Sequence, residues 1–295
     1  MEANWIGKDL SKHHRCPTKT AQENAEPRAV EVSRPNTTTY GAIVEAGASR
    51  DRQVIGRIHD RRVLQLKKVI DLHTFSIAAR DRETGAFGVA VATARPNVGS
   101  LVPWVSLRGA IATQARVNTD LGRQGQALLA QGVPVDVALS ALLRKDGERE
   151  IRQVHGVDAE RAFCHTGGSC VPWCGHEQGD VFTVAGNMLA GPDVIAAMAR
   201  AFREPGHEPR DFSERLLLAL EAGQKAGGDK RGKQSAALLV AAPREPRMYH
   251  NLRVDDHAEP VAELRRVWEV VVAHTKQLES EYGSAAVRLF GRVKN

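Results

Sequence analysis

The segment Thr74 to Ala94, TFSIAARDRETGAFGVAVATA, restricts the fold of this chain more than any other stretch. Two runs of small and β-branched residues flank the sequence Asp-Arg-Glu-Thr-Gly, whose residue types favour a turn. This pattern predicts an antiparallel β-hairpin, with strands at 74–80 and 87–94. The fold must therefore contain a β-sheet that accommodates a hairpin headed by a threonine.

The rest of the chain adds strands and helices in clusters. Hydrophobic periodicity predicts strands at 110–116, 151–157, 161–165, 181–186, 235–242 and 249–254. It predicts helices at 119–130 and 134–145, a helix that starts at Pro192, a helix that starts at Phe212, and a last helix at 260–278. Strict alternation of strands and helices is absent, so a doubly wound parallel sheet is disfavoured. We expect an α+β fold in which two packed sheets lie between helices, a four-layer αββα sandwich.

Three segments are expected along the chain. Residues 1–49 are polar, contain several prolines and show no lasting apolar period, whereas residues 50–72 include apolar residues that could line a short helix or strand. Residues 1–72 as a whole are predicted to be a poorly ordered N-terminal extension. It is interpreted as an accessory extension, although vector-derived or upstream sequence has the same pattern. A single domain is expected at 73–280, and a C-terminal tail at 281–295.

Composition and charge exclude several classes of protein. Of 295 residues, 42% are hydrophobic and 26% charged, which is ordinary for a globular protein. Most of the formal charge of +6 lies before residue 73, so a nucleic-acid partner for the main domain has little support. No apolar run is long enough to span a membrane, and the N-terminus lacks the order of a secretory signal. We expect a cytoplasmic protein, in which four cysteines do not form a disulfide scaffold.

Several short sequence motifs occur together in one order along the chain. They are the hairpin itself, then LVPW, ATQARVN, HTGGSCVPWCGH, AGNMLAGPDVIAAM, LEAGQKAGGDKRGKQSAALLV and LRVDDHAEPVAELRR. In this combination the chain resembles the family of unknown function numbered 1028, from about Thr74 to Trp268. That family is classed with the Ntn-hydrolase-like folds, in which an N-terminal Thr, Ser or Cys heads a strand inside a sandwich of two sheets. The resemblance implies the same fold for this chain.

Thr74 is the candidate nucleophile. A hydroxyl needs a base to remove its proton, and a free α-amine on the same residue can serve because its pKa is about 7.7–8.0. His73 precedes Thr74, so this chemistry requires a cut between them or a different translation start. The alternative is a β-branched residue that starts a strand. Ser76 shares the face of Thr74 and can hydrogen-bond the site or fill the sheet.

The stretch GGDKRGKQS supplies the expected partners of Thr74. The resemblance implies that Asp229 and Ser235 orient the terminal amine and tune its protonation. Arg231 suits a substrate carboxylate, because its fork of donors matches two oxygens. A helix end followed by a solvated, charged turn explains the same residues equally well.

Further polar residues are candidates for the oxyanion or the substrate. Gln114 and Asn187 are amides at strand ends, where they can donate to a developing oxyanion or form caps and turns. Arg95 ends the second hairpin strand, where a cation can steady negative charge. Trp173 and His176 can line a pocket. For Asn118 a helix cap is the favoured interpretation.

No metal or cofactor is expected. The span from Cys164 to His176 holds five residues of metal-ligating type, but their spacing fits no standard zinc site. Neither GxGxxG nor a P-loop is present to bind nucleotide phosphates. Asp255 and Asp256 are interpreted as a polar turn before the last helix.

These features predict an Ntn-type amidohydrolase that cleaves a small amide or related C–N bond. Thr74 attacks, Asp229 and Ser235 orient its amine, and Gln114 or Asn187 steadies the oxyanion. The alternative is a non-catalytic member of the fold that binds a small molecule or a partner, with a weaker link to cell-wall metabolism. Homo-oligomeric assembly is expected in either case.

Overall fold

The predicted hairpin forms the centre of a six-stranded sheet in the computed structural model, which describes residues 71–204, 211–243 and 247–283. Thr74 pairs with Thr93 and Arg80 with Phe87, so the predicted antiparallel hairpin is confirmed. The antiparallel order is β11-β10-β3-β2-β9-β8. Its strands are β2 (Thr74–Arg80), β3 (Phe87–Thr93), β8 (Gly175–Gln178), β9 (Phe182–Gly186), β10 (Ser235–Ala241) and β11 (Asn251–Val254).

A second antiparallel sheet contains five strands in the order β1-β5-β6-β7, with β4 also paired to β5. Its strands are β1 (Asp71–Leu72), β4 (Pro103–Ser106), β5 (Gly109–Arg116), β6 (Arg152–Asp158) and β7 (Ala162–Thr166). Strand β1 comes from the end of the predicted extension, whose residues 1–70 lie outside the described part of the chain. The polypeptide thus passes from one sheet to the other at His73, immediately before Thr74.

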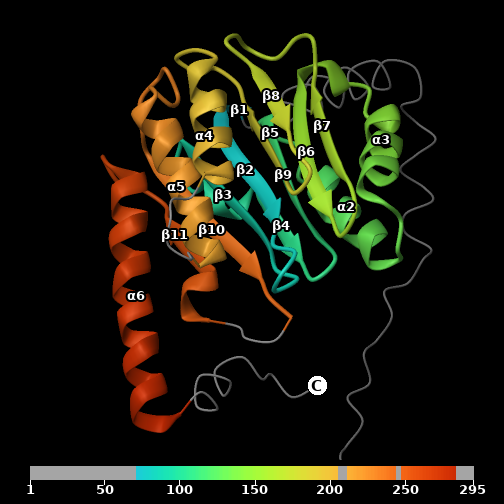
Figure 1. Cartoon of the computed structure of the whole chain (residues 1–295). Helices are drawn as coiled ribbons and strands as arrows, with labels where there is room; N and C mark the ends of the chain where they lie inside the picture. The colour runs from blue at the N-terminus through green and yellow to red at the C-terminus, as the bar shows by residue number, and fades with distance from the viewer. Residues whose placement is uncertain (1–70, 205–210, 244–246, 284–295) are drawn as a thin grey trace, which may run out of the picture. The chain divides into compact units, whose positions relative to one another are not determined.

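The helices lie on the faces that the two sheets turn away from each other (Figure 1). Helices α4 (Asp193–Arg203), α5 (Phe212–Lys225) and α6 (Pro260–Tyr282) pack on the six-stranded sheet. Helices α2 (Thr119–Ala130) and α3 (Val135–Lys145) pack on the five-stranded sheet. The described residues therefore form a mixed α+β fold, as predicted.

The hydrophobic core is divided among three interfaces. Phe75, Ile77 and Leu216 belong to the cluster between the six-stranded sheet and its helices. Val89 and Ala112 belong to the cluster between the sheets. The third cluster joins α2 and α3 to the five-stranded sheet. Side chains of β2 point alternately to the two faces of the six-stranded sheet. Both faces are covered, one by helices and one by the other sheet, so every residue of β2 is buried.

No helix in the described ranges has the length and apolar character needed to cross a membrane.

Candidate active site

Thr74 lies at the start of β2 with its side chain fully buried. Alternation along β2 puts Thr74 and Ser76 on the face toward the five-stranded sheet, opposite to Phe75. Within the part of the chain that the structure describes, the Thr74 hydroxyl has no hydrogen-bond partner. Buried polar atoms are almost always paired, so a hydroxyl left unpaired here calls for a functional explanation.

The carbonyl oxygen of His73, the residue that acylates the nitrogen of Thr74, accepts two side-chain hydrogen bonds. Thr93 donates its hydroxyl at 2.5 Å, and Arg231 donates Nη2 at 2.8 Å. Donors that converge on a carbonyl oxygen stabilise the negative charge that develops there when a nucleophile attacks the carbon. A hydroxyl, a carbonyl carbon and two oxyanion donors are thus assembled around one peptide bond.

Asp229 holds Arg231 in place. The carboxylate accepts Nε of Arg231 at 3.0 Å and Nη2 at 2.6 Å, and it also accepts the backbone N–H of Ala94 at 3.2 Å. The preceding Gly227 and Gly228 have φ of +114° and +54°, which glycine adopts without strain, so the chain can turn here. Asp229 and Arg231 were both predicted as site residues, and they form one unit beside His73. The role of Asp229 toward a free amine stays a prediction.

Ser235 and Arg95 form a separate pair. The Ser235 hydroxyl donates to the backbone carbonyl of Arg95 at 2.5 Å and accepts the N–H of Val98 at 3.1 Å. The Arg95 side chain is exposed. Ser235 is nevertheless opposite Thr93, which is opposite Thr74, so three buried hydroxyl residues share one row across β10, β3 and β2.

A buried amide network lies between the sheets, centred on Gln153. Its Nε2 donates to the carbonyl of Gly186 at 2.9 Å and to that of Gly175 at 3.1 Å. Its Oε1 accepts Nε2 of Gln114 at 2.7 Å and Nδ2 of Asn187 at 2.8 Å. Gln114 and Asn187, predicted from separate segments of the chain, therefore meet at a third residue that was not predicted.

The two glycine carbonyls fix the direction of every bond in this network. Carbonyl oxygens only accept, so Gln153 must point Nε2 toward them and Oε1 toward the other amides. The Oδ1 atom of Asn187 is then turned to His73, whose Nδ1 lies 2.6 Å away and must carry the proton. The Oε1 atom of Gln114 accepts the Ser76 hydroxyl at 2.7 Å.

His155 closes the network on the other side. Since Ser76 donates its only proton to Gln114, Nε2 of His155 must donate to the Ser76 oxygen, 2.8 Å away. Nδ1 of His155 then accepts from Thr183, also at 2.8 Å. Burial, helped by the nearby charge of His176, lowers the pKa of His155 to about 3, so its imidazole is neutral near pH 7.

Gln153, His155 and Thr93 were missed by sequence reasoning, although two of them carried a signal. Gln153 and His155 are two positions apart, so both project from one face of β6 into a buried layer. Polar residues at core-facing positions of a strand indicate a buried network. Thr93 offers no such signal, because threonine is common in strands.

His176 and Trp173 lie at the edge of this network. Nε2 of Gln153 also lies 2.8 Å from Oγ1 of Thr166, so its two hydrogens are shared among three acceptors, and the Thr166 hydroxyl lies 2.9 Å from Nδ1 of the exposed His176. Trp173 is partly buried against the core, and its ring lies so close to Gly175 that an added Cβ would be 2.6 Å from it. Of the two, His176 alone is linked to the network by hydrogen bonds.

Two non-glycine residues next to the network have a left-handed backbone. Ala115 follows Gln114 with φ of 67°, and Met188 follows Asn187 with φ of 55°. This conformation is uncommon outside glycine, and such outliers concentrate at functional sites. The backbone thus departs from regular geometry directly after each of these two amide residues.

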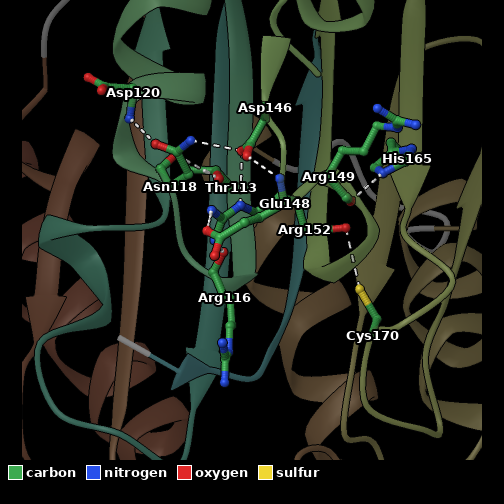
Figure 2. A network of polar contacts seen from close by, with 10 residues as sticks. All are labelled: Thr113, Arg116, Asn118, Asp120, Asp146, Glu148, Arg149, Arg152, His165 and Cys170. Atoms are coloured by element: carbon green, nitrogen blue, oxygen red, sulfur yellow. Dashed lines mark hydrogen bonds and ion pairs between the residues drawn. The ribbon is translucent and has the colours of Figure 1, made fainter. Parts of the chain in front are cut away.

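A second polar cluster anchors the strands that carry the network (Figure 2). Arg152 is buried, binds Asp146 at 2.9 Å and Glu148 at 2.5 Å, and donates to the carbonyl of Arg116 at 2.8 Å. These contacts fix β6 to the end of β5, where Gln153 and Gln114 are opposite each other.

Asn118 caps α2 by accepting the N–H of Asp120, so the predicted cap is confirmed.

The cysteines of the Cys164–His176 span are part of the packing. Cys170 donates to the Arg152 carbonyl at 3.3 Å, and burial raises its pKa to about 11. Burial also raises the pKa of Cys164 to about 12. Across the described ranges no three His, Cys, Asp or Glu side chains come together as a metal site requires.

The fold and the site together define a class of mixed α+β proteins in which a threonine heads a central strand of one of two packed sheets. The model of a family of unknown function, DUF1028, matches residues 74–264, so this chain belongs to that family and the predicted resemblance is confirmed. The matched segment begins at Thr74.

A solved structure agrees with this assignment. The crystal structure of protein SPO2555 from Silicibacter pomeroyi, a DUF1028 protein, is 32% identical to the chain, with a TM-score of 0.63. The similarity covers 73% of this chain and 90% of SPO2555. No curated protein matches the chain.

Proposed function

We propose that the chain is an N-terminal-nucleophile-type amidohydrolase with a four-layer αββα, Ntn-hydrolase-like sandwich, in which Thr74 cleaves a small amide or related C–N bond. The observation that carries the proposal is the buried Thr74 hydroxyl, which has no partner among the described residues, next to a carbonyl held by Thr93 and Arg231. The beginning of the family match at Thr74 also supports it.

The first reaction releases Thr74 as an N-terminal residue. Its Oγ1 attacks the carbonyl carbon of His73, and Thr93 and Arg231 stabilise the oxyanion. The C–N bond then breaks, the nitrogen takes up the hydroxyl proton, and an ester joins His73 to Oγ1 of Thr74. Water hydrolyses this ester, which leaves a carboxylate on His73 and a free hydroxyl and amine on Thr74.

The same groups then act on a substrate. The free amine takes the hydroxyl proton as Oγ1 attacks the amide carbonyl, and it returns a proton to the leaving amine. Water hydrolyses the acyl-enzyme. Gln114 and Asn187 each already give an N–H to Gln153, so in this proposal Thr93 and Arg231 hold the oxyanion while the amides shape the site.

The test is the covalent state of the full-length chain. Intact-mass analysis and N-terminal sequencing should find a fragment that begins at Thr74, with Thr74→Ala remaining full length and Thr74→Ser cleaved. Hydrolysis of small amides should appear with the fragment. A folded chain that keeps the His73–Thr74 bond through prolonged incubation from pH 5 to pH 9 would overturn the mechanism.

One observation favours a second candidate, a non-catalytic binding protein. Leu72 pairs with Ala115 in β1 and β5, so the residues before Thr74 are part of a sheet in the uncut chain. A protein that functions with this strand in place would bind a small molecule or a partner without covalent chemistry. The same mass measurement separates the candidates, because the binding protein stays full length.

A further inference from the structure

The side chain of His73 occupies a defined, buried position beside the bond that Thr74 is proposed to cut. The residue is 6% exposed, and its Nδ1 lies 2.6 Å from Oδ1 of Asn187. Its carbonyl oxygen is held at the same time by Thr93 and Arg231. The acyl half of the scissile bond is therefore bound through both its oxygen and its side chain.

We propose that this position is the acyl-group pocket of the enzyme, and that it selects amides of N-acylated acids whose side chain carries an N–H donor, such as histidine. The inference rests on the proposed function. The self-cleavage ester and a substrate acyl-enzyme contain the same bonds, because in each an acyl carbon is joined to Oγ1 of Thr74. When the substrate's carbonyl oxygen accepts from Thr93 and Arg231, its side chain takes the place of the His73 imidazole.

The pocket requires a donor because Asn187 cannot rotate its amide without penalty. Rotation would bring the Asn187 oxygen against Oε1 of Gln153 and its nitrogen against the protonated Nδ1 of His73. Gln153 cannot rotate to compensate, since the carbonyls of Gly186 and Gly175 require its Nε2. The pocket thus presents a fixed acceptor, and a buried acceptor left unpaired costs binding energy.

The preceding residue sets a second feature of the substrate. The nitrogen of His73 is acylated by Leu72, which pairs with Ala115. A substrate with a blocked amine fits this arrangement without placing an unpaired ammonium group between the sheets. The predicted class is therefore an N-acyl amino acid amide rather than a free amino acid amide.

The test uses cleaved protein that begins at Thr74 and is prepared from the full-length chain. The substrates are three aminomethylcoumarin amides. These carry N-acetylhistidine, N-acetylleucine and an N-acetylthiazolylalanine whose ring nitrogen replaces Nδ1 but has no proton. We expect kcat/KM for the histidine amide to exceed that of the thiazole amide by about tenfold or more, because a site built to bind an N–H rejects an isostere that lacks it. Equal rates, or a faster thiazole amide, would overturn the inference.

The outcomes separate this inference from the proposed function. If hydrolysis is lost in Thr74→Ala but is equally fast for the histidine and thiazole amides, the acyl-group pocket is overturned. The proposed amidohydrolase activity is then still supported. Absence of hydrolysis of all three amides and of an N-acetylalanine amide, by protein that begins at Thr74, counts against the amidohydrolase itself, and the assignment is then overturned with it.

The full-length chain offers a test without any substrate. His73→Asn retains an N–H donor, whereas His73→Leu introduces a side chain similar in size to asparagine that has no N–H donor. We expect the leucine variant to form the Thr74 fragment at least tenfold more slowly than wild type, and the asparagine variant to be less impaired. Equal cleavage of the leucine variant and wild type would contradict the pocket.

Discussion

Arg231 contacts the carbonyl oxygen of His73 at 2.8 Å with the same Nη2 atom that binds Asp229 at 2.6 Å. The ion pair fixes the guanidinium plane before any charge develops on the carbonyl. Fixed donors stabilise an oxyanion more effectively than mobile ones, because they need no reorganisation during the reaction. Asp229 therefore acts on the scissile bond through Arg231.

Replacement of Arg231 should slow self-cleavage. We expect Arg231→Ala to form the Thr74 fragment about 10²–10³ times more slowly, which is the usual effect of removing one oxyanion donor. Arg231→Lys should recover only part of the rate, since lysine keeps the charge but lacks the planar fork. Time courses by intact mass measure this. Arg123→Ala, which removes an exposed arginine of α2, is the control and should cleave at the wild-type rate.

Gln153 should be essential for stability. Gln153→Leu removes the acceptor shared by Gln114 and Asn187 and leaves their buried N–H groups unpaired. At about 1–3 kcal/mol for each of the two unpaired groups, we expect a loss of about 2–6 kcal/mol in the free energy of unfolding. Urea denaturation measures it. Gln131→Leu, at an exposed position after α2, should change stability by less than about 0.5 kcal/mol; comparable losses in both variants would argue against the network.

His155 should make stability depend on pH. Burial lowers its folded-state pKa from 6.5 to about 3, so between these values the unfolded chain binds a proton that the folded chain does not. The free energy of unfolding must then rise with pH in this window, by up to about 1.4 kcal/mol per pH unit. In His155→Gln this contribution is absent. Urea denaturation from about pH 4 to pH 7 should give a steeper dependence for wild type, and parallel curves would refute the assignment.

The Arg152–Asp146 pair should contribute far more to stability than a surface pair. Their side chains are only 6% and 10% exposed, and removal of one partner leaves the other charge buried. We expect Arg152→Ala to lower the free energy of unfolding by about 3–5 kcal/mol. Asp120→Ala, which breaks an exposed pair with Arg123, should cost less than about 1 kcal/mol. Chemical denaturation of both variants decides this, and similar small losses would contradict it.

The elements with strong local patterns were predicted well. Strand β2 and helix α2 have the predicted bounds, 74–80 and 119–130, because an uninterrupted apolar strand or a capped, amphipathic helix is encoded by neighbouring residues. Strands β4 and β8 were missed. Each has four residues, and neither shows the apolar alternation of a longer strand, so their pairing depends on the strands beside them.

The candidate site was predicted only in part, for a related reason. The sequence alone determined the hairpin, the threonine that heads it and the clustered order of strands and helices, because these depend on residues a few positions apart. Only the tertiary structure decided that His73 meets Asn187 and Arg231, which are 114 and 158 positions away. Hydrogen bonds act over about 3 Å, so contacts between such distant positions exist only once the two sheets have packed and their buried polar groups have found partners.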